Sequence, residues 1–409
     1  MSVERVAFIV FHACPLAAPG QGKSGGMNVY VRELARALGD RGVHVDLFTR
    51  IHPQTDSMIE QVSPMVRVVH LPGGDPESPM ESMYGHLPEF VEAVREFQQS
   101  NRLDYQLVHS HYWLSGWVGR ILAQELCVPH VITFHTLGLI KMQSRAGEVE
   151  PPERQVVEQE LMASAQRIVA FSAHERDAMI RLYQAQAGRI AVAPCGVDLS
   201  LFRPLDQQQA RQRLGLNGEK VFLYVGRLEP IKGLELLLHT TAQLETCEPV
   251  RVLVVGGEAN GDQEVDRLRL LARTLDVDDI FDFVGRVDQE DLPWYYNAAD
   301  VCVVPSYYES FGLVALESMA CGTPVVAARV GGLSTIVEHG STGYLKSWRC
   351  PEGFANSLEM IISSSRLQES LGLAARRRAE GMGWDQVADT LSQLYDTLTN
   401  EPVEGDNSI

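Results

Sequence analysis

The chain has 409 residues, of which 45% are hydrophobic and 22% are charged, a balance typical of folded globular proteins rather than of disordered chains. The formal net charge is −18, and such an acidic surface repels nucleic acids and anionic membranes at long range, so neither is expected as a partner. At roughly 100–200 residues per domain, this length predicts two domains, each large enough to bury a core.

The cysteines and the first residues point to a reducing compartment. Seven cysteines are widely spaced and form no Cys-x-x-Cys pair, so the pattern indicates neither a zinc site nor a disulfide framework. Glu4 stands where a signal peptide would carry positive charge, and no stretch approaches the ~20 apolar residues that span a membrane. We therefore expect a cytoplasmic protein without a membrane partner.

The first half of the chain alternates short apolar runs with helical patterns. A Gly-rich loop and an amphipathic helix over residues 28–42 follow the first apolar run. Strands are predicted at residues 5–11, 43–50, 66–71, 105–111 and 128–135. This alternation predicts a mostly parallel sheet with helices on both faces.

The alternation pauses near residues 195–215 and then restarts. Strands are predicted at residues 220–227, 250–257, 280–287, 300–306 and 323–329, with helices between them. We predict an α/β protein with two doubly wound, Rossmann-like domains facing each other across a cleft. The predicted divisions are residues 1–205, residues 206–385, and a terminal helix with a polar tail at 386–409. Ligands of such sheets bind beyond the carboxyl ends of the strands.

The segment SYYESFGLVALESMACG, residues 306–322, places two glutamates eight positions apart across a strand–loop–helix junction. Glu309 would lie beside the start of the helix, where backbone N–H groups and the helix dipole favour an anion such as a diphosphate. Those N–H groups belong to Ser310, Phe311, Gly312 and Leu313. Glu317, two turns along the helix, can accept hydrogen bonds from a hydroxylated part of the same ligand. The alternative is a surface helix with two ordinary glutamates.

Two further segments offer anion sites. Arg227 and Lys232 in GRLEPIKG follow the first strand of the second domain, and two cations at that spacing can bracket a diphosphate. Gly25 and Gly26 precede the first helix, where glycine lets the backbone approach a phosphate closely. The alternatives are solvated surface charges and a flexible connection, since the loop matches neither a Walker A motif nor the GxGxxG order.

Histidines and an arginine lie near strand ends in the first domain. We interpret His135 as a hydrogen-bonding residue that faces the cleft and His109 as a core histidine. No HxxxH or HExxH spacing supports a metal site, and DVDD at 276–279 enters a strand from the wrong end of the sheet to hold one. Arg154 begins a helix after two prolines, so it either aims at a small anion or lies on the surface.

Together these motifs resemble those of the retaining glycosyltransferases of the GT-B fold, in the family that contains sucrose-phosphate synthase, sucrose synthase and the inositol-phosphate N-acetylglucosaminyltransferase of mycothiol synthesis. ESFGLVALE is similar to the family's pair of glutamates, and GRLEPIKG is similar to its phosphate clamp. The resemblance extends from Phe8 to about Trp384. It implies an enzyme that transfers a glycosyl unit from a nucleotide sugar with retention, without a metal or other cofactor.

The resemblance also implies a role for each motif. The first domain would bind the acceptor and the second would bind the donor, expected to be UDP-glucose. The catalytic residues would be His135, Glu309, Arg227 and Lys232. Of these, Arg227 and Lys232 would stabilise the leaving diphosphate. The donor would contact Gly25, Gly26, Arg227, Lys232, Val287, Glu309, Ser310, Phe311, Gly312, Leu313 and Glu317. The acceptor would contact Asn28, Tyr112, Thr136, Lys141 and Arg154.

The acceptor segments resemble two branches of the family. GGMNVYV and HSHYWLSGWVG are most similar to the inositol-phosphate enzymes, whose pattern has a lysine where Tyr84 stands. GHLPEFVEAV and HTLGLIKM are similar to sucrose-phosphate synthase, whose pattern has a lysine near Met80. We favour fructose 6-phosphate as the acceptor, which implies a role in sucrose biosynthesis and a separate phosphatase acting on the product.

Two other classes of protein share this architecture. A sugar-nucleotide 2-epimerase would bind the same donor without an acceptor, so Lys141 and Arg154 would be incidental. A non-enzymatic sugar-binding protein would be exported and would have no use for Arg227 and Lys232. A transferase that joins a nucleotide sugar to a small phosphorylated acceptor uses all four cations.

Overall fold

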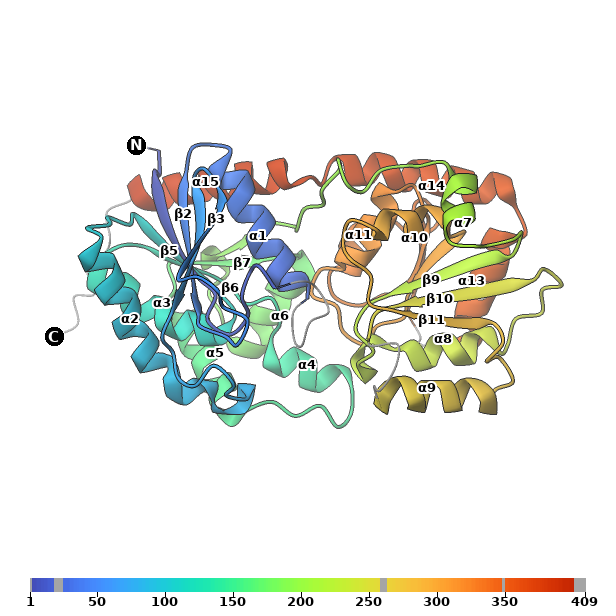
Figure 1. The fold of residues 1–409 in the computed structure, drawn as a ribbon, viewed down its shortest axis with the longest axis horizontal. Helices are drawn as coiled ribbons and strands as arrows, with labels where there is room; N and C mark the ends of the chain where they lie inside the picture. Colours follow the sequence, from blue (N-terminus) through green and yellow to red (C-terminus); the bar gives the residue numbers. More distant parts are fainter. Residues whose placement is uncertain (1, 18–24, 258–262, 348–349, 401–409) are drawn as a thin grey trace. The chain divides into compact units, whose positions relative to one another are not determined.

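The chain forms two compact units, each built on its own sheet (Figure 1). The computed structural model describes residues 2–17, 25–257, 263–347 and 350–400. The first unit comprises Met1–Pro194 together with Trp384–Ile409, and the second comprises Cys195–Gly383. The first break thus precedes Cys195, whereas the sequence pattern placed it at 205–206, and the terminal helix belongs to the first unit instead of standing apart.

The first unit holds an eight-stranded sheet in the order β3-β4-β2-β1-β5-β6-β7-β8. Its strands are β1 (Arg5–Ile9), β2 (His44–Arg50), β3 (Ile59–Ser63), β4 (Val66–Leu71), β5 (Leu107–His111), β6 (His130–Thr133), β7 (Arg167–Ala170) and β8 (Ile190–Val192). All neighbours are parallel except β3, which pairs with β4 in the antiparallel direction. The predicted strands did not include β3, β7 and β8, because an exposed edge strand and runs of three or four residues leave little periodicity to read.

Helices cover both faces of this sheet, as the alternation predicted. They are α1 (Gly26–Gly39), α2 (Leu87–Ser100), α3 (Trp113–Leu126), α4 (Gly138–Ser144), α5 (Pro152–Ser164), α6 (Ala173–Tyr183) and α15 (Trp384–Asn400). In α1 the apolar residues recur at helical spacing, and Val31, Leu34 and Leu38 are fully buried. The burial of such faces against the sheet is the main force that fixes the unit.

The last helix returns to the first unit because its apolar face needs cover. In α15 the residues Trp384, Leu391 and Tyr395 are buried, and the Tyr395 hydroxyl lies 2.6 Å from Nδ1 of His109. Arg41, just after the end of α1, forms an ion pair of 2.7 Å with Asp389 of α15. The terminal helix therefore completes the core of a sheet whose last strand ends at Val192, far earlier in the chain.

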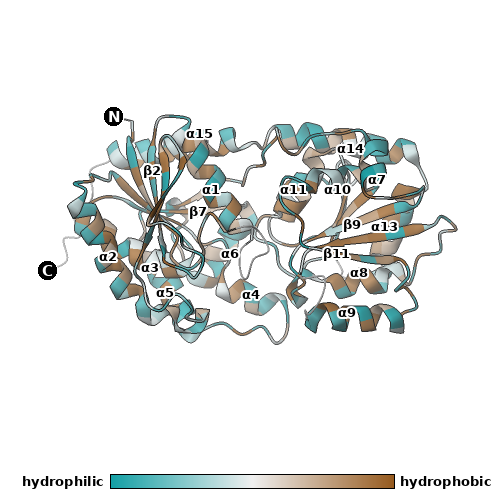
Figure 2. Cartoon of the chain, viewed as in Figure 1, coloured by the Kyte–Doolittle hydropathy of each residue, from teal (hydrophilic) through white to brown (hydrophobic). Residues whose placement is uncertain are grey.

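The second unit holds a six-stranded, all-parallel sheet in the order β11-β10-β9-β12-β13-β14. Its strands are β9 (Lys220–Val225), β10 (Val250–Val255), β11 (Phe281–Gly285), β12 (Val301–Val304), β13 (Val325–Ala328) and β14 (Gly343–Lys346). Its helices are α7 (Gln207–Arg213), α8 (Leu234–Thr241), α9 (Gln263–Thr274), α10 (Leu292–Ala298), α11 (Leu313–Ala320), α12 (Leu333–Ile336), α13 (Pro351–Ile362) and α14 (Ser365–Glu380). The middle residues of β9, a strand inside the sheet, are buried, and Figure 2 shows strands of this sheet largely in apolar colours, as expected of parallel strands covered on both faces.

Each unit therefore has the Rossmann-like architecture that the sequence predicted. None of the described helices combines the length and the apolar character needed to cross a lipid bilayer.

Candidate active site

Both sheets reverse their strand order at one point, and the predicted site residues follow the strands on either side of it. In the second unit the reversal lies between β9 and β12, which precede Lys232 and Glu309 respectively. In the first unit it lies between β1 and β5, and Tyr112 follows β5 directly. Loops at such a reversal diverge to opposite faces of the sheet and leave room for a ligand. Each unit thus carries its own group of predicted site residues. The group in the second unit, where the donor was expected, is called the donor half, and the group in the first unit, where the acceptor was expected, is called the acceptor half.

In the donor half, the predicted phosphate clamp meets the predicted pair of glutamates. Nζ of Lys232 lies 2.7 Å from Oε2 of Glu309, although 77 positions separate the two residues. Arg227 is more open: its side chain is 37% exposed and forms an ion pair with Glu229 at 2.7 Å. The structure therefore brings Lys232 to Glu309 and leaves the Arg227 side chain more exposed than that of Lys232.

Glycines shape the loop that carries Glu309. Gly312 caps α11 with φ +101°, and a Cβ there would lie 2.6 Å from Leu333 Cδ2. At Gly331, φ is +46° and a Cβ would overlap the carbonyl oxygen of Glu309. Gly332 then donates its N–H to that oxygen at 3.1 Å. The sequence reasoning did not single out the Gly331–Gly332 pair, although adjacent glycines are a recognised signal of close backbone approach.

Glu317 is held inside the donor half rather than on a surface. Its carboxyl accepts a hydrogen bond of 2.7 Å from the hydroxyl of Tyr296, which the sequence reasoning missed. Burial raises the pKa of Glu317 to about 7, although the Tyr296 hydrogen bond lowers it. This carboxyl therefore titrates near neutral pH, a property more common at functional sites than on a solvated helix.

The other residues predicted to contact the donor lie in loops or at helix starts of one unit or the other. Val287 follows β11 and is half-buried, while Ser310 and Leu313 are half-buried around the start of α11. The first N–H groups of a helix have no partner within it, so this end of α11 suits an anion. In the first unit, Gly25 caps α1 and Gly26 is its first residue.

The acceptor half is centred on Arg154, which is 1% exposed. Its Nε donates to Glu158 at 2.6 Å, and Nη2 donates to the side chain of Thr136 at 2.9 Å. Nη1 donates to the hydroxyl of Tyr112 at 3.1 Å, and the guanidinium also stacks over that ring at 4.9 Å. The structure thus assembles Tyr112, Thr136 and Arg154, which the sequence had grouped only by resemblance.

A carboxylate joins the two cations of this half. Glu150 places Oε1 2.7 Å from Nζ of Lys141 and Oε2 2.6 Å from Nη1 of Arg154. Burial alone would raise the pKa of Glu150, but Arg154 and Lys141 outweigh it and lower that pKa. Glu150 is therefore ionised and occupies the place between the two cations. The sequence reasoning missed it, although Glu150 precedes Arg154 by four positions, a spacing at which side chains can meet; the fold then adds Lys141.

Glu158 fixes the arginine from the other side. Its carboxylate accepts hydrogen bonds from Arg154, from the backbone N–H of Gly138 and from the hydroxyl of Tyr183, and its side chain is fully buried. Burial alone would lower the pKa of Arg154, but Glu158 and Glu150 raise it. The guanidinium is accordingly charged and held rigidly in position.

Two residues of this half have strained backbones. Tyr112 has φ +81° and ψ 158°, a region that is nearly restricted to glycine. His135 has φ +61° within a tight turn in which Thr136 N donates to Phe134 O at 2.7 Å. The other described non-glycine residues with positive φ are Arg102, Cys127, Gln184 and Asp276, all just after helices, where this conformation is ordinary. Tyr112 and His135 follow strands β5 and β6 instead of helices, and backbone strain of this kind is more typical of functional sites.

His135 belongs to a row of buried histidines. Its Nε2 lies 3.0 Å from Nδ1 of His111, and burial lowers the pKa of His135 to about 3. His109 pairs both ring nitrogens, with Tyr395 and with Thr133, which confirms it as a core histidine. His135 is therefore neutral near pH 7 and can offer a hydrogen bond but no positive charge.

Asn28 has a structural task in addition to any contact with a ligand. Its Oδ1 accepts the N–H of Gly25 at 3.2 Å, and its Nδ2 donates to the carbonyl of Cys14 at 2.6 Å. Asn28 is 1% exposed, so its amide mainly fixes the start of α1. One N–H and one oxygen lone pair remain for a ligand.

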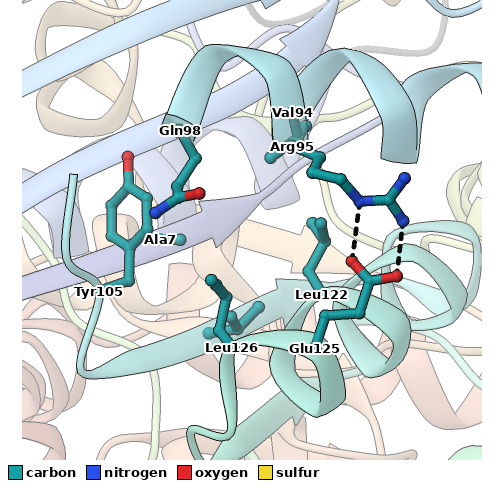
Figure 3. A pocket seen from close by; sticks show the side chains of 9 residues that line it. Ala7, Val94, Arg95, Gln98, Tyr105, Leu122, Glu125 and Leu126 are labelled. Atoms are coloured by element: carbon teal, nitrogen blue, oxygen red, sulfur yellow. Dashed lines mark hydrogen bonds and ion pairs between the residues drawn. The ribbon is translucent and has the colours of Figure 1, made fainter. Parts of the chain in front are cut away.

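A small pocket of the first unit lies between α2 and α3 and contains none of the predicted site residues (Figure 3). Its wall is mostly apolar, and the pair Arg95–Glu125 closes one side. The pocket offers too few polar groups to orient a sugar or a phosphate.

Comparison with known proteins identifies the family. Residues 206–378 match the model described as "Glycosyl transferases group 1", and residues 24–201 match the one described as "Glycosyltransferase Family 4". The D-inositol 3-phosphate glycosyltransferase 2 of Catenulispora acidiphila is 40% identical over 96% of this chain and 94% of its own length. The chain belongs to the GT-B glycosyltransferases of group 1.

Two further comparisons match the chain to one protein from each of the two branches. The D-inositol 3-phosphate glycosyltransferase of Rhodococcus jostii is 41% identical over 97% of this chain and 90% of its own length. The solved structure of sucrose-phosphate synthase from Thermosynechococcus elongatus is 38% identical with a TM-score of 0.89, and the match covers 97% of this chain and 99% of that one. This glycosyltransferase is therefore similar to enzymes of both branches, and both are named for phosphorylated compounds.

Proposed function

We propose that this glycosyltransferase moves a glucosyl unit from UDP-glucose to fructose 6-phosphate, with retention of configuration, to give sucrose 6-phosphate. The observation that carries the proposal is the cation pair Lys141 and Arg154, which converge on one carboxylate in the acceptor half. A site that holds one oxyanion between two cations suits the phosphate of a small acceptor.

In the donor half, the proposal assigns the leaving diphosphate to Arg227, Lys232 and the first turn of α11. The ammonium group of Lys232 contacts the carboxylate of Glu309, so it points toward the loop that precedes α11. Glu309 would accept hydrogen bonds from hydroxyls of the transferred sugar, and Glu317 would accept them from the ribose. These cations would stabilise the charge that develops on the diphosphate, so the chemistry would need no metal ion.

The reaction would proceed on one face of the sugar. The bond from the anomeric carbon to the diphosphate oxygen breaks while the bond to the acceptor hydroxyl oxygen forms, and the leaving diphosphate takes the proton of that hydroxyl. His135 would contribute as a neutral hydrogen-bonding group beside the sugar, since burial keeps its imidazole uncharged. Tyr112 and Thr136 would position the acceptor phosphate together with Arg154.

The choice of fructose 6-phosphate is supported by the likeness to sucrose-phosphate synthase over nearly the whole chain. Tyr84, where the inositol-phosphate pattern has a lysine, stacks on Trp113 with ring centroids 5.8 Å apart and supplies no cation. A separate phosphatase would then release sucrose from the product.

The second candidate acceptor is an inositol phosphate, favoured by relatives that are 40–41% identical and named D-inositol 3-phosphate glycosyltransferases. The sucrose-phosphate synthase pattern has a lysine near Met80, and Met80 packs against the apolar core of the first unit. This chain therefore lacks one cation of each pattern.

The test is a comparison of acceptors with purified enzyme, UDP-glucose and a short exposure to EDTA, with UDP release as the readout. Release with fructose 6-phosphate, and not with fructose, inositol 1-phosphate or D-inositol 3-phosphate, is the expected result. Release that depends on an inositol phosphate, or on UDP-N-acetylglucosamine as donor, would replace the proposal with its alternative. A requirement for added Mg²⁺ or Mn²⁺ would contradict the metal-free chemistry.

A further inference from the structure

A cysteine and two histidines meet at the carboxyl edge of the first sheet, outside the set assigned to the transfer reaction. Cys14 follows β1, His52 follows β2, and His70 lies near the end of β4. One ligand atom from each residue lies within 4.8 Å of the others. Strands β1, β2 and β4 are parallel neighbours, so their carboxyl ends share one edge and gather residues that are distant in sequence.

Both histidines turn the same ring nitrogen toward the cluster. Nδ1 of His70 lies 3.1 Å from the carbonyl oxygen of Ser57, and because a carbonyl only accepts, this nitrogen carries the proton. Nδ1 of His52 lies 3.3 Å from Oε1 of Gln54, which favours the same tautomer. In each ring the lone pair is then on Nε2. Carbonyl partners behind a ring are the arrangement that orients metal-binding histidines.

The spacing of the donor atoms suits a small tetrahedral ion. Cys14 Sγ and His70 Nε2 are 3.4 Å apart. A zinc ion with bonds of about 2.3 Å to sulfur and about 2.0 Å to nitrogen separates those two atoms by about 3.5 Å at the tetrahedral angle. Cys14 and His70 therefore already stand at nearly the separation that a shared zinc ion requires.

The third donor atom lacks a partner. Nε2 of His52 is buried and makes no hydrogen bond to any of the described residues. A buried nitrogen in that state costs free energy unless a ligand satisfies it. The unsatisfied atom belongs to a residue of the same cluster, which is a second observation that points to a bound ion.

We propose that Cys14, His52 and His70 bind one Zn²⁺ ion that stabilises the first unit. Thiolate and imidazole are the donors that this ion takes, and three side chains leave one tetrahedral position for water. The carbonyl of Cys14 also accepts the hydrogen bond from Asn28, so the ion would tie the start of α1 to strands β2 and β4. The sequence pattern had indicated no zinc site, because ligands at positions 14, 52 and 70 have no motif spacing and meet only through the sheet topology.

The test measures zinc binding by the full-length, untagged protein. The protein is stripped with a chelator, equilibrated with micromolar ZnCl₂ by dialysis, and assayed for bound metal and for thermal unfolding. We expect one zinc ion per chain and a higher unfolding temperature with zinc, since an ion bound only by the folded state stabilises it. Substoichiometric zinc, or equal unfolding temperatures with and without zinc, would overturn the proposal.

Variants locate the ion. Cys14→Ser and His52→Gln should each lose the bound zinc and the thermal shift, whereas the matched control Cys127→Ser, an exposed cysteine after α3, should keep both. His52→Gln is the safer variant for folding, because His52 lies in a partly exposed loop. Undiminished zinc in His52→Gln and Cys14→Ser would overturn the assignment.

Cobalt gives a spectroscopic readout that does not depend on stability. With CoCl₂ in place of zinc, the wild-type protein should show a thiolate-to-cobalt charge-transfer band, and Cys14→Ser should not. Absence of that band from the wild type would exclude Cys14 as a ligand. Because these measurements use no sugar substrate, they can fail while the proposed transfer reaction stands, and the reverse is also true.

Discussion

The two halves of the candidate site hold their cations in opposite ways. Arg154 in the acceptor half has a side chain that is 2% exposed and lies between two carboxylates, whereas Lys232 and Arg227 in the donor half are 23% and 37% exposed and contact one carboxylate each. An anion bound in the acceptor half must replace an internal carboxylate, but in the donor half it meets cations that are already partly hydrated. The difference implies that changes in the first half affect folding and acceptor choice, and changes in the second affect donor binding.

The sharpest test of this contrast is Arg154→Ala. Removal of the guanidinium leaves Glu158 buried without its cation, and breaking a buried pair in this way costs about 3–5 kcal/mol of unfolding free energy. We expect a large loss of stability in urea unfolding. The variant Arg154→Met with Glu158→Gln should recover part of that loss, because no charge is left unpaired. If Arg154→Ala unfolds like the wild type, Arg154 is not held as the structure indicates.

In the donor half, Lys232→Ala should weaken UDP binding and leave stability nearly unchanged. A hydrogen bond to a charged group contributes about 1.5–3 kcal/mol, so the Kd for UDP should rise by about 10–100-fold in calorimetric titration. The matched control is Lys141→Ala, which removes a lysine of similar exposure from the acceptor half and should leave the UDP affinity as it was. Equal effects of the two variants on UDP would remove the contrast between the halves.

Glu150→Gln tests whether the acceptor phosphate must displace a carboxylate. Neutralising Glu150 removes an anion that competes for Lys141 and Arg154, so the KM for fructose 6-phosphate should fall by about tenfold, which is about 1.4 kcal/mol. The kcat should change little. Glu148→Gln is the control, since Glu148 lies 3.6 Å from Lys141 and does not reach Arg154 within salt-bridge distance. A higher KM for Glu150→Gln would mean that the carboxylate helps to hold the acceptor.

The smallest expected effect is a pH dependence of donor binding through Glu317. Its pKa in the folded protein is about 7, so the carboxylate that would accept ribose hydrogen bonds is lost as the pH falls below 7. The affinity for UDP should therefore drop severalfold between pH 8 and pH 6. Glu317→Gln should remove that part of the dependence, which separates it from titration of UDP itself.

The same shift predicts a stability effect of opposite sign to that of an ion-paired acid. Folding raises the pKa of Glu317 above its unfolded value of 4.5, so the folded state binds more protons between pH 4.5 and 7. The contribution of Glu317 to the unfolding free energy therefore falls as the pH rises through this window. Glu317→Gln should be more stable than the wild type at pH 8 and similar to it near pH 4.5. Equal stability of the variant and the wild type at pH 8 would contradict a buried Glu317 carboxyl with a raised pKa.

The fold and much of the donor half were accessible from the sequence. The apolar runs of strands such as β9 and β12 are contiguous, and Lys232 and Glu309 each follow one of them, so their positions in the chain predicted a shared edge. The acceptor half was less accessible. Tyr112, Thr136 and Arg154 were grouped by resemblance alone. Glu150 and Glu158 were missed, although each lies four positions from Arg154.

The sequence by itself determined the local periodicities and the residue types in the loop after each strand, because these depend on neighbours along the chain. It also determined the excess of acidic residues, which is a matter of composition. The tertiary structure decided which distant groups share a carboxylate or a metal-binding position. The cluster of Cys14, His52 and His70 exists because parallel strands deliver their carboxyl ends to one edge. For the same reason Arg154 reaches Tyr112 and Thr136, which follow the neighbouring strands β5 and β6. The return of α15 to the first unit has a related cause: its apolar face finds cover on the first unit, whose residues precede it by hundreds of positions.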